Sequence, residues 1–244
     1  TEWFQLYLIR YAEGYWPSFM NPLQSYVINR LNLNLEIKEK RRNELSGAYS
    51  HLCAEQLVEF NRLEGELERY PLNKNLRLPT TLGNLLRASE MYASDRYGLD
   101  TITVWPRFWL TLPNNTQEIL ISARMKLDER ASLLFWSLAI SIWTIWAWWA
   151  PILGVFAAFI AYKGLIDAAG IYGDLLRSTF DIHRFDLYKS LHLPLPENIM
   201  NEKNEGEALT MYLRRGYHPS CKLFKHELTK ETENSQGSGT IAEA

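Results

Sequence analysis

The feature that most constrains the fold is a long run without charge in the second half of the chain. From Ala131 to Tyr162 the sequence contains no Asp, Glu, Lys, Arg or His over 32 residues. One straight helix of this length would measure about 48 Å at 1.5 Å per residue, well beyond a bilayer hydrocarbon core of about 30 Å. A run so long and so rich in Trp is costly to cover with protein. It favours a membrane-inserted segment over a buried hairpin inside a soluble domain.

Pro151, with Gly154 just after it, divides this run. Proline starts a helix well and interrupts one badly. We therefore predict a transmembrane helical hairpin over residues 131–173, in which 131–149 crosses, 150–153 turns and 154–173 returns. Four Trp residues crowd the approach to the turn and are interpreted as an interfacial aromatic belt: Trp143, Trp146, Trp148 and Trp149.

Basic residues flank both ends of the predicted hairpin. Arg124, Lys126 and Arg130 precede it, and Arg177 and Arg184 follow it. Because a hairpin leaves both of its ends on one side, the positive-inside rule places both flanks in the cytoplasm. In a bacterium this predicts the inner (plasma) membrane, with the soluble parts cytoplasmic and the lipid bilayer as the first partner.

Two charges fall inside the predicted returning helix. Lys163 and Asp167 lie about 18 Å and about 24 Å from the turn at 1.5 Å per residue. A charge at mid-bilayer costs about 2.5–3.5 kcal/mol on insertion scales, so such residues often serve an ion path, a proton relay or a lock between helices. The alternative is structural: Lys163 extends towards the headgroups, and Asp167 pairs with Lys163, four residues away on the same face, or with Arg130.

Small residues recur at steps of three and four along the same helix: Gly154, Ala157, Ala161, Gly164 and Ala168. Such a stripe lets helix backbones approach closely in lipid. It can seat the two arms of the hairpin against each other, or it can join copies of the chain in an oligomer. A single hairpin per chain makes a pore only if several chains assemble.

The segments before the hairpin are predicted to be helical. Residues 1–30 include an apolar N-terminal helix that either lies in the membrane interface or ends a spanning helix that starts before Thr1, a core helix being the alternative. Residues 31–130 form a cytoplasmic helical region. Within it, apolar positions at roughly heptad spacing predict one long amphipathic helix over 37–70, which could form half of an antiparallel helical pair. Its basic run 38–42 is either a solvated face or a contact for anionic headgroups.

Finer signals subdivide the rest of this region. Thr80 or Thr81 is expected to cap a helix that reaches about Tyr92, and the chain turns at 97–98. An extended piece is predicted at 101–105, and Pro106 is expected to open a short aromatic helix. A helix capped at 114–116 should then continue without interruption into the hairpin. The hairpin is therefore expected to stand on a helical stalk.

After the hairpin, residues 174–227 are predicted as a cytoplasmic return stalk, helical to about Leu191. Its DIHRFD stretch (181–186) favours an ion-pair cluster over an acid–base catalytic site, because the sequence offers no nucleophile to partner it. Three soft ligands at irregular spacing in 218–226 (His218, Cys221 and His226) are too weak a signal to predict zinc. Residues 228–244 are polar and predicted to be disordered.

Composition excludes several classes of protein. The formal net charge of −2 excludes a strongly basic nucleic-acid binder. Two cysteines far apart exclude a disulfide-dense scaffold and a CxxC site. Phosphate loops, HExxH, GxSxG and internal repeats are absent from the sequence. We therefore predict no catalytic residue, no metal ligand and no cofactor, and the chain is not expected to be an enzyme.

The strings PTTLGNLLRASEMY, RYGLD, VWPRFW, WAWWAP and YGDLLRSTFDIHRFDLY resemble a group of bacterial helical membrane proteins that carry no assigned activity. The resemblance extends from about Glu13 to Gly216. It implies a helical membrane fold, often with an additional N-terminal membrane segment. It brings no catalytic residues with it.

The sequence thus predicts an all-α membrane protein, a central hairpin on a helical stalk with cytoplasmic helical flanks. Its expected function is a membrane-anchored scaffold or assembly protein that binds a partner protein through its cytoplasmic helices. The alternative is a homo-oligomeric channel or membrane effector that uses the small-residue stripe with Lys163 and Asp167. An enzyme that uses Asp181 and His183 is the weakest hypothesis.

Overall fold

The computed structural model describes residues 2–145 and 147–217, and within these ranges it contains helices and connections but no strand. The helices are, in chain order, α1 (Glu2–Glu13), η1 (Ser18–Met20), α2 (Asn21–Gly47), η2 (Tyr49–His51), α3 (Ala54–Leu67), η3 (Lys74–Leu76), α4 (Thr81–Tyr97), α5 (Thr101–Thr111), α6 (Asn114–Ala139), η4 (Ile140–Ile145), α7 (Ala150–Ser190) and α8 (Ile199–Arg215). The all-helical fold is as predicted.

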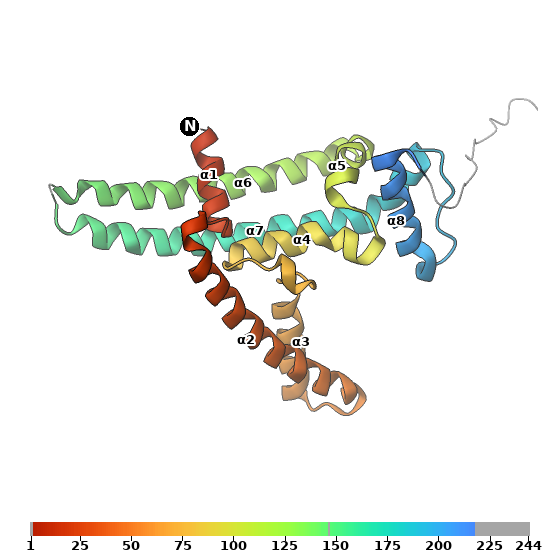
Figure 1. The fold of residues 1–244 in the computed structure, drawn as a ribbon, viewed down its shortest axis with the longest axis horizontal. Coiled ribbons are helices and arrows are strands. Elements are labelled where there is room, and N and C mark those ends of the chain that lie inside the picture. The colour runs from red at the N-terminus through yellow and green to blue at the C-terminus, as the bar shows by residue number, and fades with distance from the viewer. Residues whose placement is uncertain (1, 146, 218–244) are drawn as a thin grey trace, which may run out of the picture.

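A long antiparallel hairpin of α6 and α7 forms the axis of the molecule (Figure 1). As predicted, α6 continues from the stalk into the charge-free run, and α7 ends at Ser190. The turn, however, lies before Ala150 and not at 150–153. Pro151 occupies the first turn of α7, where its missing N–H costs no hydrogen bond, so α7 begins earlier than predicted.

The two arms differ in their capacity to cross a membrane. Among the described residues, α7 is the one helix that is long and apolar enough, judged by length and composition. The prediction of two crossing arms is therefore not confirmed. The α-helical part of α6 that lacks charge runs only from Ala131 to Ala139, because the chain then tightens into the 3₁₀ helix η4.

A body of shorter helices packs on the hairpin far from its turn. Helix α4 lies along α7, α5 contacts α7 near the start of α6, and α8 packs on α4 and α5 (Figure 1). The core of this body includes Phe108 and Phe180, whose rings stack with centroids 4.5 Å apart. Both rings are fully buried, so they join α5 firmly to α7.

Local signals explain α4 well and α5 poorly. Thr80 is the N-cap of α4, and its hydroxyl accepts a hydrogen bond from the Gly83 amide, as predicted. The helix extends to Tyr97, beyond the predicted end near Tyr92, and Gly98 ends it at a φ of 70°. The extended piece predicted at 101–105 is wrong, because α5 begins at Thr101 and contains Pro106. Its β-branched residues become helical because Val104, one turn before Phe108, is buried in the core.

An arm made of α2 and α3 projects away from the hairpin (Figure 1). The single helix predicted over 37–70 is wrong, because the chain breaks after Gly47 and folds back. The predicted apolar positions are divided between α2 and α3, and Leu45 of α2 packs on Phe60 and Leu63 of α3. The heptad pattern therefore describes an antiparallel pair and not one helix.

Helix α1 crosses the hairpin beside the start of α4 (Figure 1). Ile9 is buried against Leu82, Leu127 and Ala131. The α1 backbone also touches α4 directly, since a Cβ on Gly83 would lie 1.9 Å from the Glu13 carbonyl oxygen. The position of α1 is thus set by contacts with both α4 and α6.

Candidate functional site: the apolar hairpin end and the charged body

The end of the hairpin is covered with exposed apolar side chains. Both helices extend past α1 and α4 towards their turn (Figure 1). The exposed apolar residues of this end come from both arms: Leu133, Trp136, Leu138, Ile140, Ile142, Trp143, Trp148, Trp149, Ile152, Leu153, Val155, Phe156, Phe159 and Ile160. Monomeric soluble proteins rarely expose a contiguous apolar surface of this extent.

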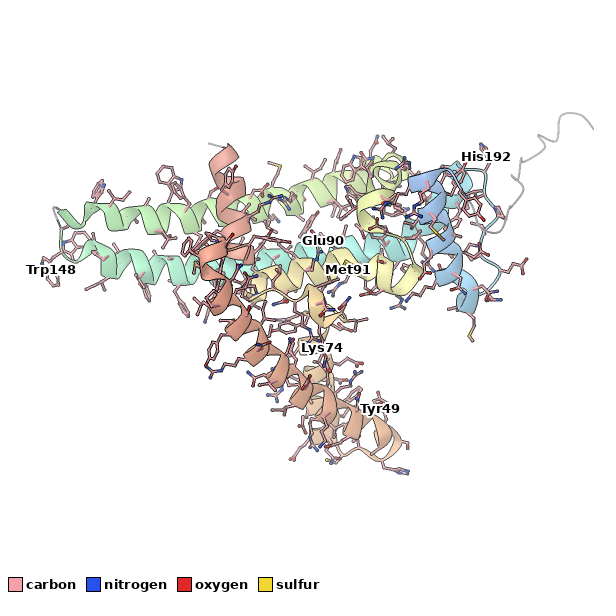
Figure 2. The ribbon with its side chains drawn as sticks, viewed as in Figure 1. Tyr49, Lys74, Glu90, Met91, Trp148 and His192 are labelled. Carbon is pink, nitrogen blue, oxygen red and sulfur yellow. The ribbon has the colours of Figure 1, made fainter. Side chains whose placement is uncertain are left out.

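The predicted aromatic belt gathers at the extreme end. Trp148 lies at the turn (Figure 2), with 80% of its surface exposed, and Trp143 and Trp149 are exposed as well. Trp146 lies outside the described residues. At 1.5 Å per residue, Asp167 is about 27 Å along α7 from Trp149, which is close to the thickness of a hydrocarbon core, about 30 Å.

The structure separates the charges of Lys163 and Asp167. No ion pair joins them within 4.0 Å, and none joins Asp167 to Arg130. The Lys163 ammonium instead lies 4.7 Å from the centroid of the Phe159 ring, in a cation–π contact one turn towards the hairpin end. Asp167 and Lys163 are both exposed. The direct pairing considered for these residues is therefore not observed.

The small-residue stripe is used largely within the chain. Gly154 and Ala161 are buried, whereas Ala157, Gly164 and Ala168 are half-buried, with Gly164 facing Arg130 of α6. The buried line continues through Ala158, Leu165 and Ala169. Packing within the chain thus covers most of the stripe.

A tyrosine–carboxylate cluster joins α4 to α7 at the other end of the hairpin. The hydroxyl of Tyr97 donates to Asp181 Oδ1 over 2.5 Å, and the hydroxyl of Tyr92 donates to the same oxygen over 3.0 Å. Burial, followed by these bonds to Asp181, raises the pKa of both phenols. The guanidinium of Arg184 lies over the Tyr97 ring. The phenols therefore remain protonated donors at neutral pH.

The other charges of the DIHRFD stretch are also paired. Arg184 Nε donates to Glu202 Oε1 over 2.5 Å, which ties α7 to α8. His183 Nδ1 lies 3.1 Å from Asp186 Oδ2, and the hydrogen bond to His183 is the largest cause that lowers the pKa of Asp186. These contacts form the predicted ion-pair cluster. Sequence reasoning missed Tyr92, Tyr97 and Glu202 as its members, because they are distant in the chain.

A cavity of about 600 Å³ lies between the arm and the body. Arg42 from α2, Arg96 from α4 and Arg177 from α7 line it together with five carboxylates, Asp181 among them. The Nε atoms of Arg42 and Arg177 are buried without a hydrogen-bond partner, and Arg177 Nη2 donates to the Glu68 carbonyl over 3.0 Å. Charges of both signs from the arm and from the body meet in this cavity, which favours a structural joint over a catalytic pocket.

Ion pairs brace the arm. Lys38 pairs with Glu66 at 2.7 Å, and Arg41 pairs with Glu59 at 3.0 Å. Two of the cations in the basic run 38–42 thus bind α3 and are not presented to headgroups. At the root of the arm, Arg77 is buried and donates to Asn32, Glu39 and the Pro71 carbonyl. No sequence signal distinguished Arg77.

Within the described ranges, no group of three or more His, Cys, Asp and Glu side chains is arranged to hold a metal ion. His218, Cys221, His226 and the tail 228–244 lie outside these ranges. No family model matches the chain, and neither a curated protein nor a solved structure matches it.

Proposed function

We propose that this protein is a membrane-anchored helical scaffold, held in a bacterial inner membrane by the α6–α7 hairpin. The observation that carries the proposal is the exposed apolar sheath around the hairpin end. In water, this surface would cost about 25 cal/mol for each Å² left exposed. Insertion into a bilayer removes that cost, and a depth of about 27 Å from Trp149 to Asp167 suits one leaflet-to-leaflet crossing.

The membrane anchor is tested by charge placed on equally exposed positions of one helix. Phe156 and Ile182 both lie on α7 and are 63% and 69% exposed. If the hairpin end is inserted, Phe156→Lys puts a charge into hydrocarbon at a cost of about 3 kcal/mol, whereas Ile182→Lys stays in water. We expect the first variant to lose binding to liposomes by about a hundredfold in a flotation assay.

The control in that experiment is the second variant, which should float like the unmodified chain. Equal flotation of both lysine variants would contradict the anchor. So would an unmodified chain that stays at the bottom of the gradient with every vesicle composition.

The arm is the part of the body best suited to bind a partner protein. It projects from the hairpin, and Tyr49 lies at its far end (Figure 2). Its ion pairs join α2 to α3, and Arg77 ties α2 to the segment that follows α3. It nevertheless exposes Leu33, Ile37, Tyr49 and Val58. A braced helical pair with exposed apolar side chains is a suitable surface for another helix.

A photo-crosslinking residue at Ile37 or Val58 tests this surface in the intact cell. A scaffold predicts one discrete heterologous adduct of fixed stoichiometry from both positions, and no such adduct from Ile182. Adducts only between copies of this chain would instead support the homo-oligomeric channel. That alternative has less support, because the stripe on which it relies is largely covered within the chain. Light scattering of the detergent-solubilised protein separates the two: a pore requires a closed ring of chains.

A further inference from the structure

A second cavity lies against α6 and α7, and Arg130 and Gly164 are the lining residues nearest the hairpin turn. It measures about 550 Å³, and all of the residues that line it belong to α6 and α7. Gly164 contributes to its wall without a side chain, and a Cβ there would sit 3.6 Å from Arg130 Cδ. The glycine therefore leaves space that a longer side chain would fill.

Four charged side chains line this cavity: Lys126, Glu129 and Arg130 from α6, and Asp167 from α7. None of them forms an ion pair within 4.0 Å of another described residue. Two cations and two carboxylates make the cavity neutral overall, with charges of both signs in its wall. A neutral ligand with a separated anion and cation is the chemistry that complements it.

The level of the cavity identifies the source of such a ligand. Arg130 immediately precedes the charge-free run, and Asp167 lies about 27 Å from the hairpin end along α7. With the hairpin inserted, these residues stand at the cytoplasmic headgroups. Towards the hairpin end, the exposed surfaces of both helices are apolar, including Leu133 and Phe156, and acyl chains can lie along them.

We propose that this cavity binds the headgroup of a zwitterionic phospholipid that carries a primary ammonium. Arg130 and Lys126 hold the phosphate, because guanidinium and ammonium groups donate charge-assisted hydrogen bonds to phosphate oxygens. Asp167 and Glu129 accept from the lipid ammonium. Asp167 then has a role in lipid recognition at the membrane surface and none in ion passage. This inference rests on the proposed membrane anchor.

Native mass spectrometry of the full chain in detergent tests the site. Phosphatidylethanolamine and phosphatidylcholine with identical acyl chains are added separately, so that only the headgroup differs. We expect one retained phosphatidylethanolamine per chain, bound about tenfold more tightly than phosphatidylcholine, whose methylated ammonium donates no N–H hydrogen bond. Equal retention of the two lipids by the unmodified chain would overturn the proposal.

Two leucine variants of α7 provide a matched comparison. Gly164→Leu fills the cavity and should abolish selective retention. Gly170→Leu makes the same change in the same helix at a residue that does not line the cavity and where an added Cβ meets nothing within 4 Å, so it should bind like the unmodified chain. Circular dichroism verifies that both variants keep their helices. The same lipid retention in both would refute the site.

Charge variants assign the two halves of the headgroup. Arg130→Gln should weaken both lipids by about tenfold or more, whereas Asp167→Asn should weaken only phosphatidylethanolamine. Loss of both lipids in Asp167→Asn would contradict the assignment of the ammonium to this carboxylate.

Two further measurements separate the possible failures. Glycerophosphoethanolamine, which has the headgroup without acyl chains, should not displace the lipid at equal concentration; displacement would show that the site takes a soluble phosphoester. A chain that floats with vesicles but lacks headgroup selectivity overturns this inference alone, whereas a chain that does not float overturns the membrane anchor.

Discussion

Replacing Gly206 by alanine should dislodge α8 from the end of α4. A Cβ at this position would lie 1.8 Å from the carbonyl oxygen of Tyr97, far inside the 3.0 Å that real Cβ contacts essentially never cross. The obstacle is backbone and cannot rotate away. Helix α8 must therefore retreat by about 1 Å or more.

The size of the effect follows from what that retreat breaks. The hydroxyl of Thr210 donates to the Gly98 carbonyl and accepts from the Asp100 amide, each over 3.1 Å. Two such bonds contribute about 1 kcal/mol each, and overpacking adds about 1–3 kcal/mol. Alanine has a better helix propensity than glycine, which offsets about 1 kcal/mol of this loss. The net expected loss is about 2–4 kcal/mol in the local stability of α8.

Amide hydrogen exchange with mass spectrometry measures this loss directly, because it reports local opening. Peptides of α8 in Gly206→Ala should exchange roughly thirtyfold to several hundredfold faster, while α6 peptides stay unchanged. The matched control is Gly170→Ala, where the added Cβ meets nothing within 4 Å and the helix should gain up to about 1 kcal/mol. Unchanged exchange of α8 in Gly206→Ala would refute this account of the α4–α8 contact.

Three further outcomes are expected from the body. Phe180→Ala removes a fully buried ring stacked on its neighbour and should cost about 3–5 kcal/mol of unfolding free energy, visible as a lower midpoint in denaturant. Tyr97→Phe removes a 2.5 Å bond to Asp181 and should cost about 1.5–3 kcal/mol; a midpoint equal to that of the unmodified chain would disprove a stabilising role. Burial is the main cause that raises the pKa of Asp95 above 3.8, so the ionisation of this carboxyl opposes folding. Asp95→Asn should therefore raise the melting temperature at pH 7, and the gain should vanish below about pH 4. A gain that does not change with pH would contradict this cause.

Sequence reasoning succeeded where one residue decides the local conformation. The cap at Thr80 and the turn at Gly98 follow from side-chain hydrogen bonding and from the freedom of glycine at positive φ. It failed where burial overrides propensity, as at α5, whose β-branched start is helical because Val104 enters the core. It also failed at Gly47, since an apolar repeat has the same spacing on one helix as on two that fold back.

For the candidate site, the sequence determined the composition and the order of the parts, and the tertiary structure decided which of them meet. The charge-free run and Pro151 are local in the chain, so they predict an apolar hairpin without any knowledge of its neighbours. The partners of Asp181 are 84 and 89 residues away, and the separation of Lys163 from Asp167 depends on side-chain directions around α7. Contacts of this kind arise only when packing brings distant faces together, which no local periodicity encodes.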